Sequence, residues 1–411
     1  MNQLIKTFKN FICIYLITSI LFILTGCFDA TGIEELAYVV AIGLDIDESN
    51  ELELSVQIAT SDNKSSSDSS GSTSQSNSSN VTTIKCNTID SGLALINNHI
   101  SKKINLSHCQ VIIISESLAK KSISEYIDSL LNNSELRNDC SIIISKCSAK
   151  DYLNSVDPAL EDLTARYYES TINSAKHTGY TIDMTLFEFY SKMKDSCSEA
   201  YAIFGTAITK DQINNPVKEN ADYLAGSNPI TDKDVIDNIG IAVFKNDKLV
   251  GELSGLDSIC HILINNELKS CILSIPVSDF GTKFIDLKLT SEKKTKSQVH
   301  FENNIPHISV DIYLVAQGLT MNNALDYDSN EQLNHIESEA SNYISSKILN
   351  YLYKTSKEYN SDICGFGKFA LKNYLTIDDW NASNWLNNYS KAYFDVHVHI
   401  KLKSGNLFDK S

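Results

Sequence analysis

The chain has 411 residues, of which 42% are hydrophobic, and its formal net charge at pH 7 is −16. This length is sufficient for two or three globular domains, and the apolar fraction is typical of chains that bury a core. So large an acidic excess repels phosphate backbones, which argues against a nucleic-acid partner. It also argues against docking on anionic lipid through a basic patch, so association with a membrane requires another device.

The first 26 residues have the pattern of a lipoprotein signal peptide. Two lysines precede an apolar run from Phe11 to Leu24, which is shorter than the roughly 20 residues that span a bilayer. The run ends in a lipobox, Leu24-Thr25-Gly26-Cys27, in which small residues fit the peptidase and the cysteine thiol receives a diacylglycerol. We therefore expect Cys27 to become the first mature residue and to carry S-diacylglycerol and N-acyl lipid. The alternative is a short membrane anchor that happens to contain a cysteine.

Residues 27–160 are predicted to form an N-terminal α/β domain. Period-two alternation over 37–60 indicates a β-hairpin. The next segment, 61–80, has serine at 11 of 20 positions and is predicted to be a disordered loop. Continuous apolar runs over 109–115 and 140–146 predict two strands that are buried on both faces. A helix is predicted between them over 116–132, so strands and helices alternate as in α/β units.

A connecting helix and a middle domain are expected over 161–272, and a C-terminal domain over 273–411. Asn246-Asp247 indicates a tight turn between two strands of the middle domain. The C-terminal domain is expected to contain strands near 283–296 and 306–318, a long helical stretch over 329–373, and a final strand over 393–403. The predicted fold class is therefore α/β (α+β), with three small mixed α/β domains in series behind a lipidated N-terminus.

No residue pattern predicts a catalytic, cofactor or metal site. The eight cysteines after Cys27 show no C-x-x-C spacing. His397 and His399 share one face of the predicted final strand, but two nearby lysines would repel a cation, so we interpret the pair as part of an exposed strand face. Gly365-Phe366-Gly367 lacks the lysine spacing of a phosphate loop and is interpreted as a turn. We expect no enzymatic activity and no cofactor.

Trp380 and Trp385 lie in one short helical segment near the C-terminus. Tryptophan is enriched at the hot spots of protein interfaces, so these two side chains are candidates for contact with a partner. The alternative is a place in the core or between domains, where a large aromatic ring buries much apolar area.

Several segments of the chain resemble one family in order along the sequence. They are the lipobox cysteine followed by an aromatic residue and Asp29, INLSHCQVIIISESLAKKSISEYIDSLLNNSELR (104–137), GIAVFKNDKLVGELSG (240–255) and the C-terminal stretch that starts at Gly365. Together these segments are similar to the Ger(x)C spore germination lipoproteins, the C subunits of germinant receptors. The chain differs from the usual family pattern at Phe28, where tryptophan is common, and at Lys368, where an acidic residue is common.

The resemblance implies a non-catalytic lipoprotein subunit of a spore nutrient receptor, anchored by lipid on the outer leaflet of the spore inner membrane. Such a subunit acts with membrane-embedded A and B subunits to trigger germination. The alternative function is that of a solute-binding lipoprotein of a transporter. That fold requires two doubly wound lobes around a cleft, which the predicted hairpins at 37–60 and 239–253 fit poorly.

Overall fold

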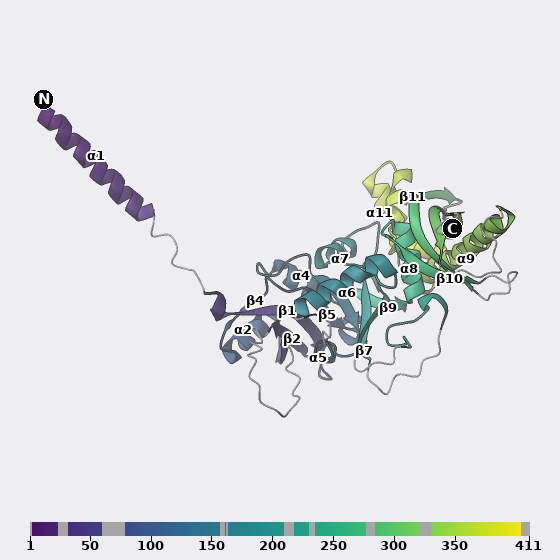
Figure 1. Ribbon diagram of the computed structural model, residues 1–411, viewed down its shortest axis with the longest axis horizontal. Coiled ribbons are helices and arrows are strands. Elements are labelled where there is room, and N and C mark those ends of the chain that lie inside the picture. Colours follow the sequence, from purple (N-terminus) through teal and green to yellow (C-terminus); the bar gives the residue numbers. More distant parts are fainter. Residues whose placement is uncertain are drawn as a thin grey trace, which may run out of the picture.

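The computed structural model describes residues 2–23, 32–59, 79–156, 161, 163–208, 218–229, 235–276, 284–319 and 330–403. Within these ranges the chain forms two β-sheets with helices packed against them (Figure 1). Helix α1 (Asn2–Ile23) lies apart from both sheets. Among the helices that the structure describes, none combines the length and the apolar character needed to cross a membrane.

The first sheet has parallel strands at its centre and antiparallel strands at its edges. Its described strands are β1 (Leu36–Ile46), β2 (Leu52–Ala59), β3 (Ser79–Cys86), β4 (Lys103–Asn105), β5 (Val111–Ser115), β6 (Ser141–Ser145), β7 (Tyr201–Ile208), β8 (Val235–Lys245) and β9 (Lys248–Leu253). Their order is β3-β2-β1-β5-β6-β7-β8-β9, with β4 beside β1. The four central strands β1, β5, β6 and β7 run parallel.

The central strands form because their residues are apolar on both faces. Every residue of β5 and β6 is buried, as expected for parallel strands that are covered on both sides. Capping boxes fix the starts of two helices: Thr88 with Ser91 before α2, and Thr185 with Glu188 before α7. The helices of this part are α2 (Ile89–His99), α3 (Glu116–Ala119), α4 (Ser124–Asn132), α5 (Ala149–Asn154), α6 (Thr164–Thr178) and α7 (Leu186–Met193).

The second sheet contains β10 (Cys271–Pro276), β11 (Phe284–Glu302), β12 (Ile305–Gly318) and β13 (Tyr393–Leu402) in that order. β10, β11 and β12 are antiparallel, whereas β13 runs parallel to β12. Parallel neighbours require a crossover, and helix α9 (Asn330–Tyr353) lies within it. The helix buries one face, because Ile336, Ala340, Ile344 and Ile348 recur every four residues. Three short helices follow: α10 (Gly367–Ala370), α11 (Ile377–Ser383) and α12 (Trp385–Asn388).

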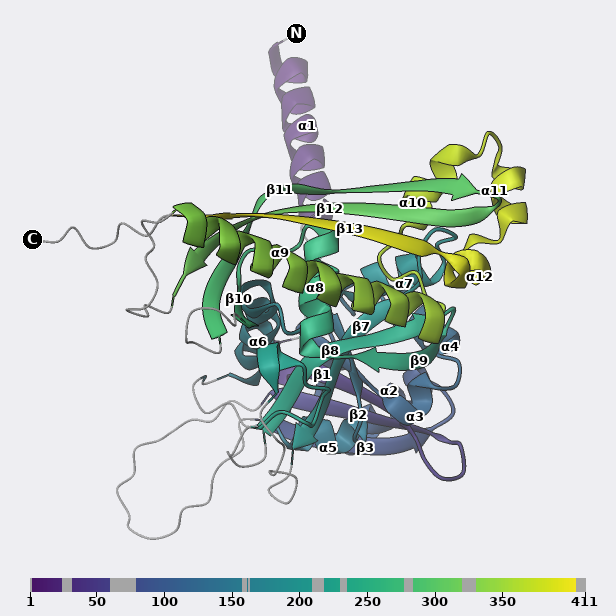
Figure 2. The same cartoon turned by 90° about the vertical axis from the view of Figure 1, so that its right-hand side faces the viewer.

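Helix α8 (Gly255–Asn265) lies between the two sheets (Figure 2). It contacts β8 of the first sheet and β11, β12 and α9 of the second. Nine of its 11 residues are buried, as expected for a helix that is covered on all sides. Ser254 and Asp257 form a capping box at its start, and Asn266 ends it in the left-handed conformation with φ of 63°. The two sheets therefore share one continuous core around α8.

His261 is the buried histidine of α8, and it bonds on both ring nitrogens. Its Nδ1 lies 2.7 Å from the hydroxyl oxygen of Tyr351 on α9, and the Asn265 side-chain nitrogen lies 2.9 Å from its Nε2. Because the Asn265 amide donates to Nε2, the proton of the neutral ring belongs on Nδ1 and is donated to Tyr351. Burial lowers the pKa of His261 from 6.5 to about 3, and the charge of Lys192 acts in the same direction.

The predicted elements of the first sheet agree with the structure at most positions. The hairpin over 37–60, the strands over 109–115 and 140–146, and the Asn246-Asp247 turn are confirmed. The helix predicted over 116–132 is divided into α3 and α4. The break has a tertiary cause, because the Ile123 N–H donates to the Asp247 carbonyl in the β8–β9 turn (3.2 Å).

Other predictions need correction or lie outside the described residues. The helix predicted over 329–373 ends at Tyr353 and is followed by a π-helical turn over 354–358, and helical structure returns only with α10 and a 3-10 turn at Leu371–Asn373. Strand β10 and helix α7 were not predicted. In the serine-rich segment, 61–78 lies outside the described residues, whereas Ser79 and Asn80 belong to β3.

The predicted boundary at residue 160 does not separate two sheets. β6 and β7 lie on opposite sides of it and pair in parallel, with Ile143 opposite Ile203. The N-terminal and middle units thus contribute to one sheet, and the described residues form a mixed α/β protein with two sheets. Division into three domains stays a prediction.

The buried His261 predicts a specific loss of stability in acid. Its folded pKa, about 3, lies below the unfolded value of 6.5, so its contribution is present above pH 6.5 and is lost as the pH falls toward 3. One pH unit in this window corresponds to about 1.4 kcal/mol. Between pH 7 and pH 5, His261→Gln should therefore reduce the pH-dependent loss of unfolding free energy by about 2 kcal/mol relative to wild type.

Urea unfolding of both chains at the two pH values measures this difference, and other titrating groups cancel because both chains contain them. His397→Gln is the matched control, since that imidazole is exposed on β13. Equal pH dependence in wild type and His261→Gln would contradict the prediction.

Candidate functional site

The lipobox residues Leu24, Thr25, Gly26 and Cys27 lie outside the described residues. The described neighbour is α1, whose side chains from residue 4 to residue 19 are exposed. Lipidation at Cys27 therefore stays a prediction.

Trp380 and Trp385 are buried inside the chain, each with 3% exposure. Their rings stack with centroids 6.1 Å apart. Both indole N–H groups are used internally: Trp380 donates to the Ser196 hydroxyl (3.0 Å), and Trp385 donates to the Asp362 carboxylate (2.8 Å). This burial corresponds to the core role that the sequence left open as the alternative, and contact of the two rings with a partner stays an untested prediction.

The side chain at the centre of this region is the carboxylate of Asp362, which is fully buried. Three N–H groups donate to it: the Trp385 indole, the Gly367 backbone (2.9 Å) and the Phe366 backbone (3.1 Å). The Gly365-Phe366-Gly367 turn thus wraps around the carboxylate, with Gly365 in the left-handed region at φ of 72°. The sequence correctly predicted a turn here, but its partner Asp362 was missed.

The turn around Asp362 also joins the two sheets. The Asp362 carbonyl accepts from the Glu199 N–H (3.0 Å), directly before β7. A Cβ at Gly367 would lie 2.4 Å from the Cys197 carbonyl oxygen, so the close approach requires glycine. The Glu199 carboxylate in turn lies 2.9 Å from the ammonium group of Lys245 at the end of β8. The backbone directly before β7 is therefore hydrogen-bonded to the backbone of the Asp362 segment.

Burial raises the pKa of Asp362 from 3.8 to about 6, against the opposing effect of its hydrogen bonds. Desolvation therefore outweighs the three donors. Because the folded pKa is the higher one, the folded state binds this proton more tightly than the unfolded chain. The contribution to stability is complete below about pH 4 and is lost as the pH rises through about 6.

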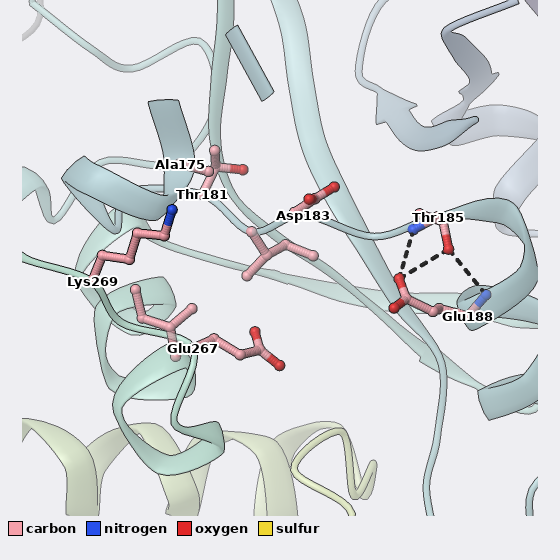
Figure 3. Close-up of a pocket in the computed structure, with 9 residues that line it drawn as sticks. Ala175, Thr181, Asp183, Thr185, Glu188, Glu267 and Lys269 are labelled. Atoms are coloured by element: carbon pink, nitrogen blue, oxygen red, sulfur yellow. Dashed lines mark hydrogen bonds between the residues drawn. The ribbon is translucent and has the colours of Figure 1, made fainter. Parts of the chain in front are cut away.

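A cavity of about 460 Å³ lies beside the C-terminal end of α8 (Figure 3). One wall is the segment that leads into α7, with Thr181, Asp183, Thr185 and Glu188, and α6 contributes Ala175. Figure 3 shows Glu267 and Lys269 on the α8 side of the cavity. Its volume lies within the range of small-molecule sites, roughly 300–1,000 Å³.

The cavity has an acidic lining, and one of its carboxylates is already hydrogen-bonded within the protein. The Glu188 carboxylate accepts from the N–H of Thr185 (3.1 Å) and from its hydroxyl (2.9 Å), so it serves the capping box of α7. Burial raises the pKa of Glu267, with Lys192 opposing the shift and Glu188 and Asp183 reinforcing it. Burial also lowers the pKa of Lys192, whose ammonium lies 4.8 Å from the Tyr201 ring centroid. This lining suits a small molecule with an amino group better than an anion.

Two family models match the chain in succession. The model described as "Spore germination protein N-terminal domain" matches residues 29–204, and "Spore germination B3/ GerAC like, C-terminal" matches residues 239–405. The first match ends within β7 and the second begins within β8, so the two models meet inside the first sheet.

Full-length relatives agree with these matches. The YfkR protein of Bacillus subtilis (strain 168), predicted to be a spore germination protein, is 24% identical over 384 residues, covering 92% of this chain and 91% of the relative. Spore germination protein GerQC of Bacillus cereus is 18% identical, covering 77% of this chain and 79% of the relative. The crystal structure of the GerBC protein matches with a TM-score of 0.51 and 16% identity, over 88% of this chain and 96% of that one, and so shares the fold.

The three N–H donors around Asp362 predict that Asp362→Asn destabilises the protein. The amide replaces an acceptor oxygen by an NH₂ group, which places a donor against a donor in either orientation and leaves a buried group unpaired. We expect the free energy of unfolding to fall by about 1–3 kcal/mol at pH 4, measured by urea unfolding. That pH lies below the folded pKa of about 6, so removal of the buried charge does not offset the lost acceptor.

Asp139→Asn is the matched control, because that carboxylate is exposed and pairs with Arg137 at the surface. Its change should stay below about 1 kcal/mol. The assignment of Asp362 as a structural centre would be wrong if both variants lost the same stability.

Proposed function

The chain belongs to the Ger(x)C family of spore germination proteins, and from this premise we propose that it is a non-catalytic lipoprotein subunit of a nutrient germinant receptor. It acts with membrane-embedded A and B subunits to trigger germination. The observation that carries the proposal is the succession of two germination-family models over residues 29–204 and 239–405. The first model begins at residue 29, so the predicted signal peptide, residues 1–26, lies before the matched part of the chain.

The junction between the sheets supports a structural rather than a catalytic role. Asp362 and His261 are two of the buried groups with large pKa shifts at that junction, and both are bonded inside the core. Neither lines the cavity beside α8. A group that lacks access to a substrate contributes to stability instead of proton transfer. The family is likewise not known for enzymes.

Attachment to the spore inner membrane through Cys27 is part of the proposal. The apolar run of the leader ends in the lipobox, and Cys27 lies two residues before the first matched residue at 29. One acyl chain binds a membrane only marginally, so S-diacylglycerol with an N-acyl chain provides a durable anchor. Tethering then raises the effective concentration of the folded part near membrane-embedded partners.

A small exposed apolar surface lies next to the buried tryptophans. Leu375 is 100% exposed and Ile377 is 65% exposed. Leu375 lies two residues before α11, the helix that carries Trp380, and Ile377 is its first residue. Exposed apolar side chains that lie close together in sequence and form one patch are typical of contact sites. We assign the contact with an A or B subunit to Leu375 and Ile377 in place of the buried indole rings.

The lipid anchor predicts a defect that is specific to one cysteine. Cys27→Ala should leave the precursor uncleaved by the lipoprotein peptidase and free of labelled fatty acid, because the thiol is the site of the thioether. Gel migration and metabolic labelling measure both effects. Cys13→Ala is the matched control, since it changes a cysteine of the same leader and should be processed normally. Labelled Cys27→Ala protein would contradict the anchor.

The receptor role predicts a nutrient-specific germination defect. Spores without this chain should lose the response to the nutrient of its own receptor, and should still germinate when dipicolinate release is triggered downstream. Complementation with Leu375→Asp/Ile377→Asp should restore little of the response and should weaken co-purification with the A and B subunits. The fold should tolerate the change, because an acidic residue at the first position of α11 favours the helix dipole.

Phe187→Asp provides the control for the surface change. Phe187 is 56% exposed and also lies in the first turn of a helix, α7, on the first sheet. This variant should assemble and respond normally. A full nutrient response by spores that lack the chain would exclude the receptor role. A thermal shift caused by amino acids alone, without the other subunits, would instead favour direct solute binding in the cavity of Figure 3.

A further inference from the structure

The end of the β11–β12 hairpin brings two histidines and a glutamate together. His300 and His307 are directly opposite each other in the ladder, and Glu302 lies two residues beyond His300 on the same face of β11. The atoms of these three side chains that can bind a metal lie within 4.8 Å of one another. In the part of the chain that the structure describes, this is the one group of three or more such residues with that geometry.

The separations match the edges of a tetrahedral zinc site. His300 Nε2 lies 3.5 Å from Glu302 Oε1, and His307 Nε2 lies 3.7 Å from Glu302 Oε2. Both distances are too long for a hydrogen bond. With metal–ligand bonds near 2.0–2.2 Å, two ligands of a tetrahedral Zn²⁺ ion lie about 3.3–3.6 Å apart. A shift of a few tenths of an ångström in side chains that are partly in solvent brings the carboxylate to that spacing.

The hairpin holds the three residues on a rigid frame. Its turn consists of Asn303 and Asn304, both in the left-handed region at φ of 51° and 62°, which is the geometry of a tight two-residue hairpin. Between His300 and Glu302 in sequence, Phe301 points to the other face and packs against Trp385, with centroids 6.4 Å apart. The His307 ring stacks on Tyr393 of β13 at 5.4 Å. Strand register thus fixes the backbone positions of the three residues, and packing on Tyr393 orients the His307 ring.

We infer that His300, Glu302 and His307 form a binding site for Zn²⁺, with water in the fourth position. Two imidazole nitrogens and one carboxylate are a ligand set that zinc accepts in proteins. Bound zinc would cross-link β11 and β12 at the end of the hairpin. The net charge of −16 favours accumulation of divalent cations near the surface.

His397 and His399 on β13 are a second pair of histidines on the same sheet, but within the described part of the chain they lack a carboxylate that both could share. They are as exposed as His300, and each lies near one carboxylate: His397 is 3.1 Å from Asp395, and His399 is 3.8 Å from Asp311. The two pairs use different carboxylates, and no third ligand joins either of them among the described residues. This pair is therefore a matched control on the same sheet.

The test uses the full chain, purified in detergent without a polyhistidine tag and freed of metal with a chelator. Isothermal titration with Zn²⁺ should give one site per chain that His300→Ala/His307→Ala weakens at least about 100-fold. Glu302→Gln, which keeps the shape of the side chain, should weaken it at least about 10-fold. Co²⁺ in place of Zn²⁺ should give the strong visible absorption of a tetrahedral site, and both variants should lose it.

His397→Ala/His399→Ala should bind Zn²⁺ with the affinity of the wild type. Thermal unfolding without metal establishes whether each variant is folded. If His300→Ala/His307→Ala does not fold, Glu302→Gln alone tests the site. Wild-type affinity in both His300→Ala/His307→Ala and Glu302→Gln would overturn the proposal. An equal loss in the His397→Ala/His399→Ala control would overturn it as well.

Discussion

The structure depends on the bonding of one buried carboxylate, that of Asp362. Its side chain holds the Gly365–Gly367 turn and the Trp385 indole, while its carbonyl holds the backbone of Glu199 ahead of β7. Burial of this carboxylate without hydrogen-bond donors would destabilise the folded state strongly. The turn, the indole and the segment before β7 must therefore assemble together. This requirement couples the two sheets, in addition to the contacts that both sheets make with α8.

The coupling has a consequence for how such a chain transmits a signal. A core that α8 shares with both sheets, and that polar bonds fix at one side, does not let the sheets move independently. A contact made at Leu375 and Ile377, close to Trp380, is therefore connected through packed side chains to the first sheet. This architecture suits the role that we propose, in which a lipid-anchored subunit holds receptor partners in a defined arrangement.

Acidic and basic groups of this protein are used mainly for structure. The Glu188 carboxylate caps α7, Asp257 caps α8 and pairs with Lys354 at 2.9 Å, and Lys245 pairs with Glu199. Partly buried pairs of this kind set the geometry of helix starts and strand ends more than they add stability. The side chains at the end of the β11–β12 hairpin differ, because the carboxylate of Glu302 faces the imidazoles of His300 and His307.

The sequence by itself determined the features that depend on short-range patterns. Period-two alternation located the β1–β2 hairpin, apolar runs located β5 and β6, and Asn246-Asp247 located a turn, since each signal is contained within a few residues. Tertiary structure alone decided the rest. Asp362 gave no motif, because its donors come from backbone and from Trp385, 23 residues away. The pairing of β6 with β7 and the meeting of His300 with His307 depend on strand register, which no local pattern specifies.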